Sequence, residues 1–428
     1  MKTKPALKKR WFTVITGIIL ILSLAWLATS NNPNIWTIRN TLQYHALKWW
    51  WQQVGYPELN APGALRGTVR NTQGRPIAGA WVLITRWNGA TYSARTEAGG
   101  SYIIRDAPAG NYRPVAGAPG YDSVALGGFW RPVTIAAGQE TVADVVLPVA
   151  TPPVVEAGAD LRLGEPAMIN CVRPLETAAM RRQVRFDSAG QPNQPTLFYT
   201  PITATAASRL PILLAVYPGP ADGWECASTP LAAAGYAVLA AGPAYSFEPE
   251  QDIDELERLL DFARAGAFPG SDNNRAAILG GSYSSLHVLG LLQRDQNVEA
   301  ALLLGPPTDL FDMRRRLENG TFRPPFGLDR ALIALGLPSH EPLRYLRYSG
   351  AYHVHPDFPP LAILHSRTDE VVPFQQSELL AKNLAMVGAA YEAHFFDGAS
   401  HYLLAEEGDA DTLKIYEITL NFLAKHLK

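Results

Sequence analysis

The chain of 428 residues is 47% hydrophobic and 18% charged, a composition typical of a globular protein with two or three domains. It excludes intrinsic disorder, a coiled coil and a collagen-like repeat. The charge is unevenly distributed. Residues 1–57 contain seven Lys or Arg and no acid, whereas the other 371 residues contain 30 basic and 39 acidic groups, a net charge of −9. Because nucleic acid binding needs a basic surface, we expect no nucleic acid partner.

An uncharged apolar segment at residues 11–28 follows five basic residues near the start of the chain. A helix of this length would measure about 27 Å, enough to cross the core of a bilayer. The positive charges before it place the amino end in the cytoplasm and the rest of the chain outside. We therefore expect residues 1–30 to form a cytoplasmic tail and a transmembrane signal anchor. The alternative is a signal peptide cleaved near Ala28, Thr29 and Ser30, which would yield a secreted protein.

Residues 31–62 are predicted to form a juxtamembrane helix, because apolar residues recur there at helical spacing. The recurring apolar positions are Ile38, Leu42, Ala46 and Trp49, and the polar Gln53 continues the same spacing. Aromatic side chains this close to a membrane span suit the headgroup layer. Packing of the same helix on the folded domains is the other interpretation, and periodicity alone leaves both open.

Short β-rich runs separated by Gly and Pro turns fill residues 63–149, a pattern typical of a β-sandwich. Several turn signatures occur in order, namely Gly67-Thr68-Val69, Gly74-Arg75-Pro76, Gly99-Gly100-Ser101-Tyr102, Pro108-Ala109-Gly110 and Pro119-Gly120-Tyr121. In these details the segment resembles the carboxypeptidase regulatory-like (transthyretin-like) domain. Because no cluster of His, Cys or carboxylates occurs in it, we expect a spacer or docking module. Residues 150–180 are predicted to form a linker, with Pro152-Pro153 stiffening it.

The chain has two cysteines, Cys171 and Cys226. In an exported protein they could pair, and two buried free thiols are equally ordinary. Neither cysteine lies in a metal-binding or redox motif, and their spacing leaves the pairing open.

From residue 181 to the end, apolar strands alternate with helical stretches, which indicates a parallel α/β sheet. One strand runs into Ser282 between small residues and then into an apolar helix, the pattern of a nucleophile elbow. Asp369 lies four residues beyond an apolar strand at 362–365, and His401 lies just beyond another at 393–396. Ser, Asp and His in this order, each shortly after a strand, is the triad order of the α/β-hydrolase fold.

These residue types suit nucleophilic catalysis. A serine hydroxyl attacks when an imidazole accepts its proton, and the imidazole needs a carboxylate to fix its tautomer. We therefore predict Ser282 as the nucleophile, His401 as its base and Asp369 as the carboxylate. A Ser–Lys dyad is excluded because no lysine occurs between Lys48 and Lys382.

No cofactor and no metal are expected. His353 and His355 share one face if their segment is extended, which suggests a metal site. The sequence offers no third ligand at a useful spacing.

Residues 195–428 resemble the prolyl oligopeptidase family of serine peptidases, particularly its dipeptidyl-peptidase branch. The matching motifs are Tyr217-Pro218-Gly219-Pro220, Asp272 with Arg275, Ser282-Tyr283, Pro307-Thr308-Asp309, and His365 to Asp369 followed by Phe374-Gln375-Gln376-Ser377. Ser284 stands where that family usually has glycine. The family's exopeptidases gate their site with a β-propeller, and no such repeat is visible here, so release of dipeptides is not implied.

An oxyanion hole needs two donors aimed at the developing negative charge. The backbone N–H of Tyr283 is expected to be one, at the positive end of its helix. For the second donor the resemblance implies the hydroxyl of Tyr217. The backbone N–H of Gly219 is the alternative, because Pro218 and Pro220 have none.

Residues 305–358 lie between two strands and are expected to form a helical lid that sets substrate size. The lid contains the run Arg314-Arg315-Arg316. This run is either a solvated helix face or a grip for a substrate carboxylate, and the first is the commoner case.

The predicted fold is thus an α/β-hydrolase domain with a mostly parallel sheet and a helical lid, preceded by a small all-β sandwich and a transmembrane helix. We expect a membrane-anchored, extracytoplasmic serine hydrolase that cleaves short peptides through an acyl-enzyme. A carboxylesterase or other acyl hydrolase with the same triad is the alternative, and a non-catalytic binding protein is a third. The expected partners are a small peptide or ester substrate and the membrane.

Overall fold

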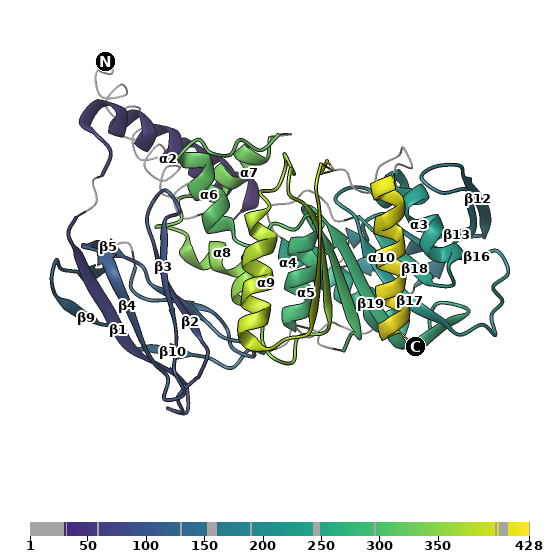
Figure 1. Cartoon of the computed structure of the whole chain (residues 1–428), viewed down its shortest axis with the longest axis horizontal. Coiled ribbons are helices and arrows are strands. Elements are labelled where there is room, and N and C mark those ends of the chain that lie inside the picture. The colour runs from purple at the N-terminus through teal and green to yellow at the C-terminus, as the bar shows by residue number, and fades with distance from the viewer. Residues whose placement is uncertain are drawn as a thin grey trace, which may run out of the picture.

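The computed structural model describes most of the chain from Ser30 onward. The described residues are 30, 32–57, 60–128, 131–151, 161–188, 191–242, 249–294, 297–325, 327–398, 400–401 and 410–427. Residues 11–28, which the sequence predicts to span a membrane, lie outside these ranges. Within the described ranges, no helix has the length and apolar character needed to cross a membrane. Figure 1 shows an elongated molecule with a β domain at one end and a large sheet at the other.

The first described helix, α2 (Pro33–Val54), packs on the rest of the protein along one face. Trp36, Asn40 and Tyr44 are buried, and their spacing of four residues places them on the same side of the helix. The Asn40 side-chain amide donates to the Ala334 carbonyl at 3.0 Å. The sequence left two interpretations of this helix open. For this face, the helix packs on the folded domains.

The β domain is built from two four-stranded sheets and a two-stranded one, in which β5 pairs with β8. In one four-stranded sheet, β1 pairs with β4, β9 and β10, and in the other β2 lies between β3 and β6, with β7 beside β6. Leu65 and Val69 of β1 share one hydrophobic core with Val82 and Ile84 of β2, so these two sheets form a sandwich. Its strands are β1 (Pro62–Asn71), β2 (Trp81–Thr85), β3 (Thr91–Arg95), β4 (Ser101–Pro108), β5 (Gly110–Tyr112), β6 (Val115–Gly117), β7 (Val124–Ala125), β8 (Val133–Ile135), β9 (Glu140–Val142) and β10 (Val145–Leu147).

A ten-stranded sheet organises the C-terminal half of the chain. Its order is β11-β13-β16-β18-β17-β19-β20-β21-β22, with β12 paired to β13. The strands from β18 to β22 in this order run parallel, and β16 and β13 add antiparallel neighbours. The strands are β11 (Arg162–Leu163), β12 (Ala167–Cys171), β13 (Thr177–Arg185), β16 (Thr196–Pro201), β17 (Leu210–Val216), β18 (Ala237–Ala241), β19 (Ser271–Gly281), β20 (Ala300–Leu304), β21 (Leu361–Ser366) and β22 (Tyr391–Phe396), and β14 (Asp187–Ser188) and β15 (Gln191–Pro192) form a separate hairpin.

Helices cover both faces of this sheet. Leu256, Val288 and Leu380 belong to the core on one face, and Leu231 and Phe422 to the core on the other. Strands covered on both faces read as continuous apolar runs, which is why β20 is buried at all five positions. The helices are α4 (Pro249–Arg264), α5 (Ser284–Arg294) and α9 (Gln375–Val387) on the first face, and α3 (Glu225–Ala233) and α10 (Ala410–His426) on the second, with η1 (Ala221–Trp224) leading into α3.

The large sheet begins earlier in the chain than the sequence predicted. β11, β12 and the start of β13 lie within residues 150–180, which were expected to be a linker. β11 and β12 are edge strands of mixed polarity, and Met168 of β12 is 60% exposed. They lack the apolar run of a buried strand, so the sequence pattern does not distinguish them from a loop.

The segment predicted to be a lid lies between the β domain and α2. Phe311 and Tyr345 pack in one cluster with Leu83 and Val115 of the β domain and with Trp36 of α2. The elements of this segment are α6 (Leu310–Glu318), α7 (Leu328–Ala334), α8 (Pro342–Arg347) and η2 (Gly350–Tyr352).

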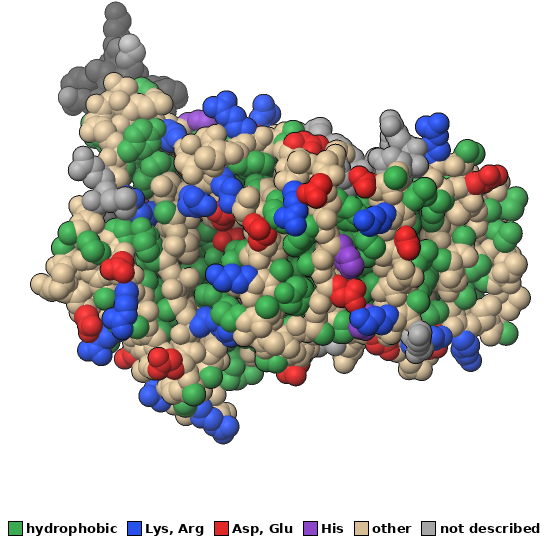
Figure 2. All heavy atoms as spheres, in the orientation of Figure 1, with side chains coloured by type: hydrophobic (Ala, Val, Ile, Leu, Met, Phe, Trp, Pro, Cys, Tyr) green, Lys and Arg blue, Asp and Glu red, His purple; other side chains and the backbone are tan. Residues whose placement is uncertain are grey.

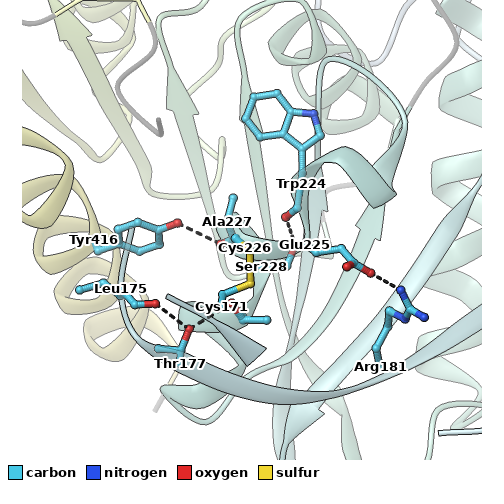
Figure 3. Close-up of a disulfide and its surroundings, with 11 residues drawn as sticks. Cys171, Leu175, Thr177, Arg181, Trp224, Glu225, Cys226, Ala227, Ser228 and Tyr416 are labelled. Carbon is cyan, nitrogen blue, oxygen red and sulfur yellow. Dashed lines mark hydrogen bonds and ion pairs between the residues drawn. A yellow bond between two sulfur atoms is a disulfide. The ribbon is translucent and has the colours of Figure 1, made fainter. Parts of the chain in front are cut away.

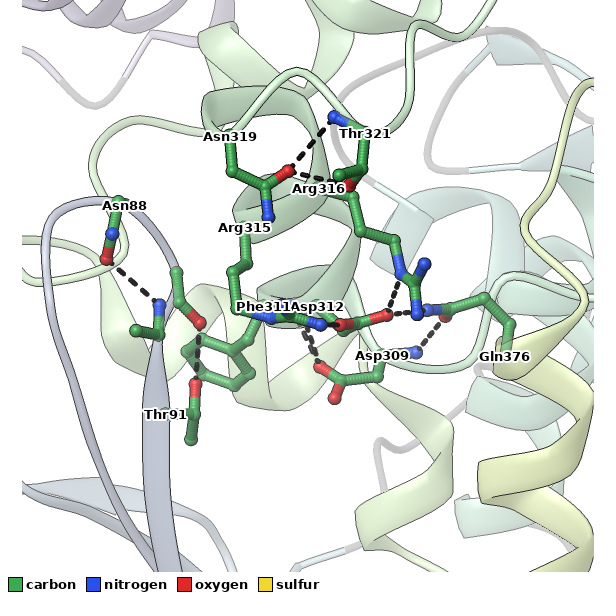
Figure 4. A network of polar contacts seen from close by, with 12 residues as sticks. Asn88, Thr91, Asp309, Phe311, Asp312, Arg315, Arg316, Asn319, Thr321 and Gln376 are labelled. Carbon is green, nitrogen blue, oxygen red and sulfur yellow. Dashed lines mark hydrogen bonds and ion pairs between the residues drawn. The ribbon is translucent and has the colours of Figure 1, made fainter.

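The three consecutive arginines of α6 all have partners within the protein. Arg314 is fully buried, and its Nε donates to Glu318 at 2.9 Å. The other two pair with Asp312, which also accepts from the side-chain amide of Gln376 at 3.1 Å (Figure 4). The expected solvated face is therefore wrong for Arg314, because an ion pair inside the lid compensates its charge.

A disulfide joins Cys171 at the end of β12 to Cys226 in α3 (Figure 3). The structure thereby gives the pairing that the sequence left open. On the neighbouring strand, Arg181 pairs with Glu225 of α3. These contacts fasten α3 to the antiparallel edge of the large sheet.

Removal of this disulfide should lower the free energy of unfolding by about 2–4 kcal/mol, because the bond restricts the unfolded chain by closing a long loop. The two cysteines are 55 residues apart in sequence. Denaturant unfolding of the Cys171→Ser/Cys226→Ser double variant beside the wild type measures the difference. Coincident unfolding curves would show that the bond contributes nothing to stability.

Candidate active site

Ser282 occupies a sharp turn between β19 and α5. Its φ is +51°, and among the described non-glycine residues only Asp106 shares a positive φ. Such a backbone costs about 1–3 kcal/mol. The surroundings hold it, because the Ser282 N–H donates to the Leu304 carbonyl of β20 at 2.7 Å. Position 280, two residues before Ser282, requires glycine, because a Cβ there would lie 2.5 Å from Val288 Cγ2.

The three residues predicted as a triad meet at this edge of the sheet. Ser282 Oγ lies 2.8 Å from His401 Nε2, and His401 Nδ1 lies 2.7 Å from Asp369 Oδ2. The Asp369 side chain is fully buried. Because β19, β21 and β22 are parallel, the loops after them open at the same edge, and residues 119 and 32 positions apart in sequence come together.

The acid of this triad is held as a carboxylate. Asp369 Oδ1 accepts the backbone N–H groups of Val371 and Val372, both at 2.8 Å. Burial alone would raise the pKa of Asp369, but hydrogen bonds from His365, His401 and the backbone hold that pKa well below its usual value. A carboxylate beside Nδ1 fixes the proton there, which leaves His401 Nε2 free to accept the serine proton.

A second imidazole also contacts Asp369. His365 at the end of β21 is fully buried, with Nε2 3.1 Å from Asp369 Oδ2 and 3.1 Å from the Val372 carbonyl. Its Nδ1 lies 2.7 Å from Ser377 Oγ. Two acceptors beside Nε2 place the ring proton there, so Nδ1 accepts from the Ser377 hydroxyl. The sequence placed His365 in a motif that matches the resembling family but predicted no role for it.

Gly305, directly after β20, fits closely against the triad. Its φ is +53°, and its N–H donates to the Leu364 carbonyl of β21 at 2.8 Å. A Cβ at this position would lie 3.2 Å from Asp369 Oδ2 and 3.2 Å from His401 Cε1. β20 lies between β19 and β21 in the sheet, so its end must pass beneath the aspartate–histidine pair. The sequence predicted only that the lid segment begins at Gly305.

Ser284, which replaces the glycine usual in the resembling family, is fully buried. Its Oγ accepts the Gly281 N–H at 3.1 Å and lies 2.6 Å from the Val216 carbonyl at the end of β17. The hydroxyl therefore ties the elbow to the strand that leads into Tyr217. The substitution is accommodated because its one polar group is hydrogen bonded.

The three predicted oxyanion donors lie in different surroundings. Tyr283 directly follows the nucleophile, and α5 begins at the next residue. The Tyr217 side chain is buried, its ring stacks on Trp224 with centroids 5.2 Å apart, and its hydroxyl lies 2.9 Å from Ser228 Oγ of α3. None of the described contacts joins that hydroxyl to Ser282. Gly219 lies in the loop after β17, and that loop packs so closely that a Cβ at Gly242 would lie 1.9 Å from the Gly219 carbonyl oxygen.

Comparison with known protein families agrees with this geometry. The model of the carboxypeptidase regulatory-like domain matches residues 64–148. The model of the prolyl oligopeptidase family matches residues 251–428, a range that includes all three triad residues. The C-terminal part of the chain, residues 251–428, therefore carries a prolyl oligopeptidase family domain. The protein is a serine hydrolase with an α/β-hydrolase fold, preceded by a carboxypeptidase regulatory-like domain, as the sequence motifs predicted.

A search of curated protein sequences finds no significant match. Among solved structures, esterase 2 of Thermogutta terrifontis phosphonylated by sarin is 18% identical, with a TM-score of 0.42 over 54% of this chain and 89% of that chain. A truncated carbohydrate esterase from gut microbiota is 19% identical, with a TM-score of 0.43 over 54% of this chain and 90% of that chain. Similarities at this level give no information on the substrate of this serine hydrolase.

His353, in the segment predicted to be a lid, is buried and hydrogen bonded within the protein. His353 Nε2 lies 2.9 Å from the Leu346 carbonyl, and burial lowers the His353 pKa. Across the described parts of the chain, no group of three or more His, Cys, Asp or Glu side chains is arranged to hold a metal ion.

Proposed function

We propose that this serine hydrolase is a peptidase that cleaves short peptides through an acyl-enzyme on Ser282. The prolyl oligopeptidase match across the triad is the observation that carries the proposal. His401 Nε2 accepts the serine proton as Oγ attacks the scissile carbonyl, and then donates it to the leaving amine. Water activated by the same imidazole hydrolyses the acyl-enzyme and releases Ser282.

For the oxyanion hole we propose two backbone donors, the N–H groups of Tyr283 and Gly219. The hydrogen bond of Tyr217 to Ser228 and the stacking of its ring on Trp224 support Gly219 over the tyrosine hydroxyl. Backbone donors held by a tight loop need no reorganisation when the negative charge develops.

Tyr217→Phe separates the two candidates for the second donor. The variant keeps the ring on Trp224 and removes only the hydroxyl, so we expect kcat to remain close to the wild-type value. Loss of the hydrogen bond to Ser228 should lower the free energy of unfolding by about 1 kcal/mol. Steady-state kinetics and denaturant unfolding measure both quantities. A fall in kcat of about 10²–10³ would return the role to the Tyr217 hydroxyl.

Ester hydrolysis is the second candidate, and the position of Tyr217 favours it. The resemblance to a peptidase family implied an oxyanion role for the hydroxyl of this tyrosine, and in the structure that hydroxyl bonds to Ser228. The triad itself serves either bond. Paired libraries of acyl esters and aminoacyl amides with identical acyl groups test the choice. Turnover of esters alone would replace the peptidase proposal with a carboxylesterase.

We further propose that residues 11–28 retain the protein in a membrane with the hydrolase domain outside the cytoplasm. The five basic residues before this segment support the orientation. The Cys171–Cys226 disulfide also supports it, because such bonds persist in oxidising compartments. Protease added to intact cells or spheroplasts should digest the hydrolase domain. Digestion only after lysis would reverse the orientation, and release of the domain into the medium would favour signal cleavage.

A further inference from the structure

The face of α2 that points away from the protein is apolar. Ile38, Leu42, Ala46 and Trp49, here called the outer stripe, lie on the side of the helix opposite Trp36, Asn40 and Tyr44, as their helical spacing requires. Ile38 is 58% exposed, Leu42 65% and Trp49 62%. Figure 2 shows hydrophobic side chains on the surface of α2, at the upper left.

Exposed apolar side chains are concentrated at this helix. Of the 15 large hydrophobic residues exposed in the described parts of the chain, six lie between Ile38 and Tyr56. Scattered exposed hydrophobic residues are normal, whereas a contiguous group indicates an interaction surface. Elsewhere on the face shown in Figure 2, acidic and basic side chains are interspersed.

The position of the stripe in the chain identifies its partner. The apolar segment at residues 11–28 ends five residues before Pro33, where α2 begins. Five extended residues reach at most about 17 Å, and Ile38 lies about 8 Å further along the helix. Any membrane that holds residues 11–28 is therefore within about 25 Å of the stripe. α2 also contains no Asp or Glu that anionic lipid headgroups would repel.

We propose that the outer stripe of α2 lies in the headgroup layer of the bilayer that residues 11–28 enter. The inference rests on the proposed membrane anchoring and adds a second contact, parallel to the membrane surface. Trp side chains are favoured at this depth, because their rings are apolar and their indole N–H remains near water.

This contact would orient the lid relative to the membrane. The opposite face of α2 carries Lys48, whose Nζ lies 2.8 Å from Glu318 of α6, and Gln43, whose amide lies 3.1 Å from His340 Nδ1 before α8. Helix α2 therefore lies between the bilayer and the lid segment. A helix bound on both sides restricts the rotation of the folded domains relative to the membrane, which a single membrane span alone would allow.

The depth of the stripe can be measured in the full-length chain. Because both native cysteines are in the disulfide, a cysteine introduced by substitution is the only free thiol. Leu42→Cys, labelled with an environment-sensitive fluorophore, is reconstituted into phosphatidylcholine–phosphatidylglycerol vesicles that contain lipids with a nitroxide near the headgroup. Leu24→Cys within residues 11–28 and Met386→Cys on α9, where the native side chain is 48% exposed, are the matched controls. Trp49→Cys supplies a second site on the stripe if the Leu42 variant fails to fold.

We expect the nitroxide lipids to quench the stripe label about as strongly as the Leu24 label, and to leave the Met386 label unquenched. A stripe label that matches Met386 while Leu24 is quenched would overturn the inference and leave the anchoring intact. Energy transfer between stripe labels without lipid quenching would assign the stripe to a second copy of the chain, and would also overturn it. Failure of the protein to float with the vesicles would overturn the anchoring and the stripe contact together.

Discussion

Ser282→Ala should abolish turnover, with kcat lowered by on the order of 10⁶-fold. The substitution deletes the oxygen that lies 2.8 Å from His401 Nε2. The fold should persist, because one oxygen is lost at a turn whose backbone is held by the Leu304 carbonyl. Kinetics on any substrate found, together with thermal unfolding of the same preparation, measure both expectations.

His401→Ala should reduce kcat nearly as much, and the double variant should be no slower than the worse single variant. Residues that act as a unit have strongly non-additive effects, because the serine is a poor nucleophile without its base. Wild-type activity in Ser282→Ala, or full additivity in the double variant, would contradict the assignment of these two residues.

Gly305→Ala should lower kcat by about 10-fold although the residue contributes no side chain. Its Cβ would lie 3.2 Å from Asp369 Oδ2 and 3.3 Å from His401 Nδ1, closer than side chains normally approach. The aspartate–imidazole pair must then shift by a few tenths of an ångström. Because misplacement of catalytic groups by about 1 Å costs on the order of 10² in rate, this smaller shift should cost about 10-fold. We expect the change mainly in kcat, because the groups that shift belong to the triad.

Gly388→Ala is the matched control for this variant. Gly388 at the end of α9 also has a positive φ, +77°, but nothing lies within 4 Å of a Cβ built there. Both variants therefore acquire the backbone strain of a left-handed alanine, about 1–2 kcal/mol, and only Gly305→Ala disturbs the triad. Equal kcat values for the two variants would show that Gly305 has no positioning role.

The order of the triad was predictable because each of its residues follows a strong signal. Ser282, Asp369 and His401 each come just after an apolar run, and parallel strands bring such positions to one edge. Gly305 and His365 were not predictable in the same way. Their roles depend on how closely the ends of β20 and β21 approach Asp369, a distance that follows from sheet register and not from spacing in the chain.

The sequence also did not predict the direction in which two side chains point. The motif around Tyr217 implied a hydroxyl aimed at the substrate, whereas stacking on Trp224 and a hydrogen bond to Ser228 turn it toward α3. Arg314 lies in a charged run typical of a solvated face, yet it is fully buried against Glu318. In both residues, the contacts that orient the side chain are not specified by the motif or by the charged run alone.

The helix α2 illustrates a pattern with two valid interpretations. Its periodicity predicted an apolar face for either the membrane or the folded domains. In the structure Trp36 and Tyr44 pack on the protein, and Ile38 and Leu42 on the other side remain exposed. Periodicity identified the outer stripe, and the buried face could be found only with its partners in place.

The most direct test of a serine hydrolase acting through Ser282 is covalent labelling with a fluorophosphonate probe. Such probes react with a serine whose hydroxyl is activated by a neighbouring imidazole. Incubation of the folded full-length protein, followed by proteolysis and mass spectrometry of the peptides, locates the adduct. We predict one adduct per chain, on Ser282, which is lost in the His401→Ala variant. An adduct on a different serine, or an unlabelled wild-type protein, would contradict the proposed active site.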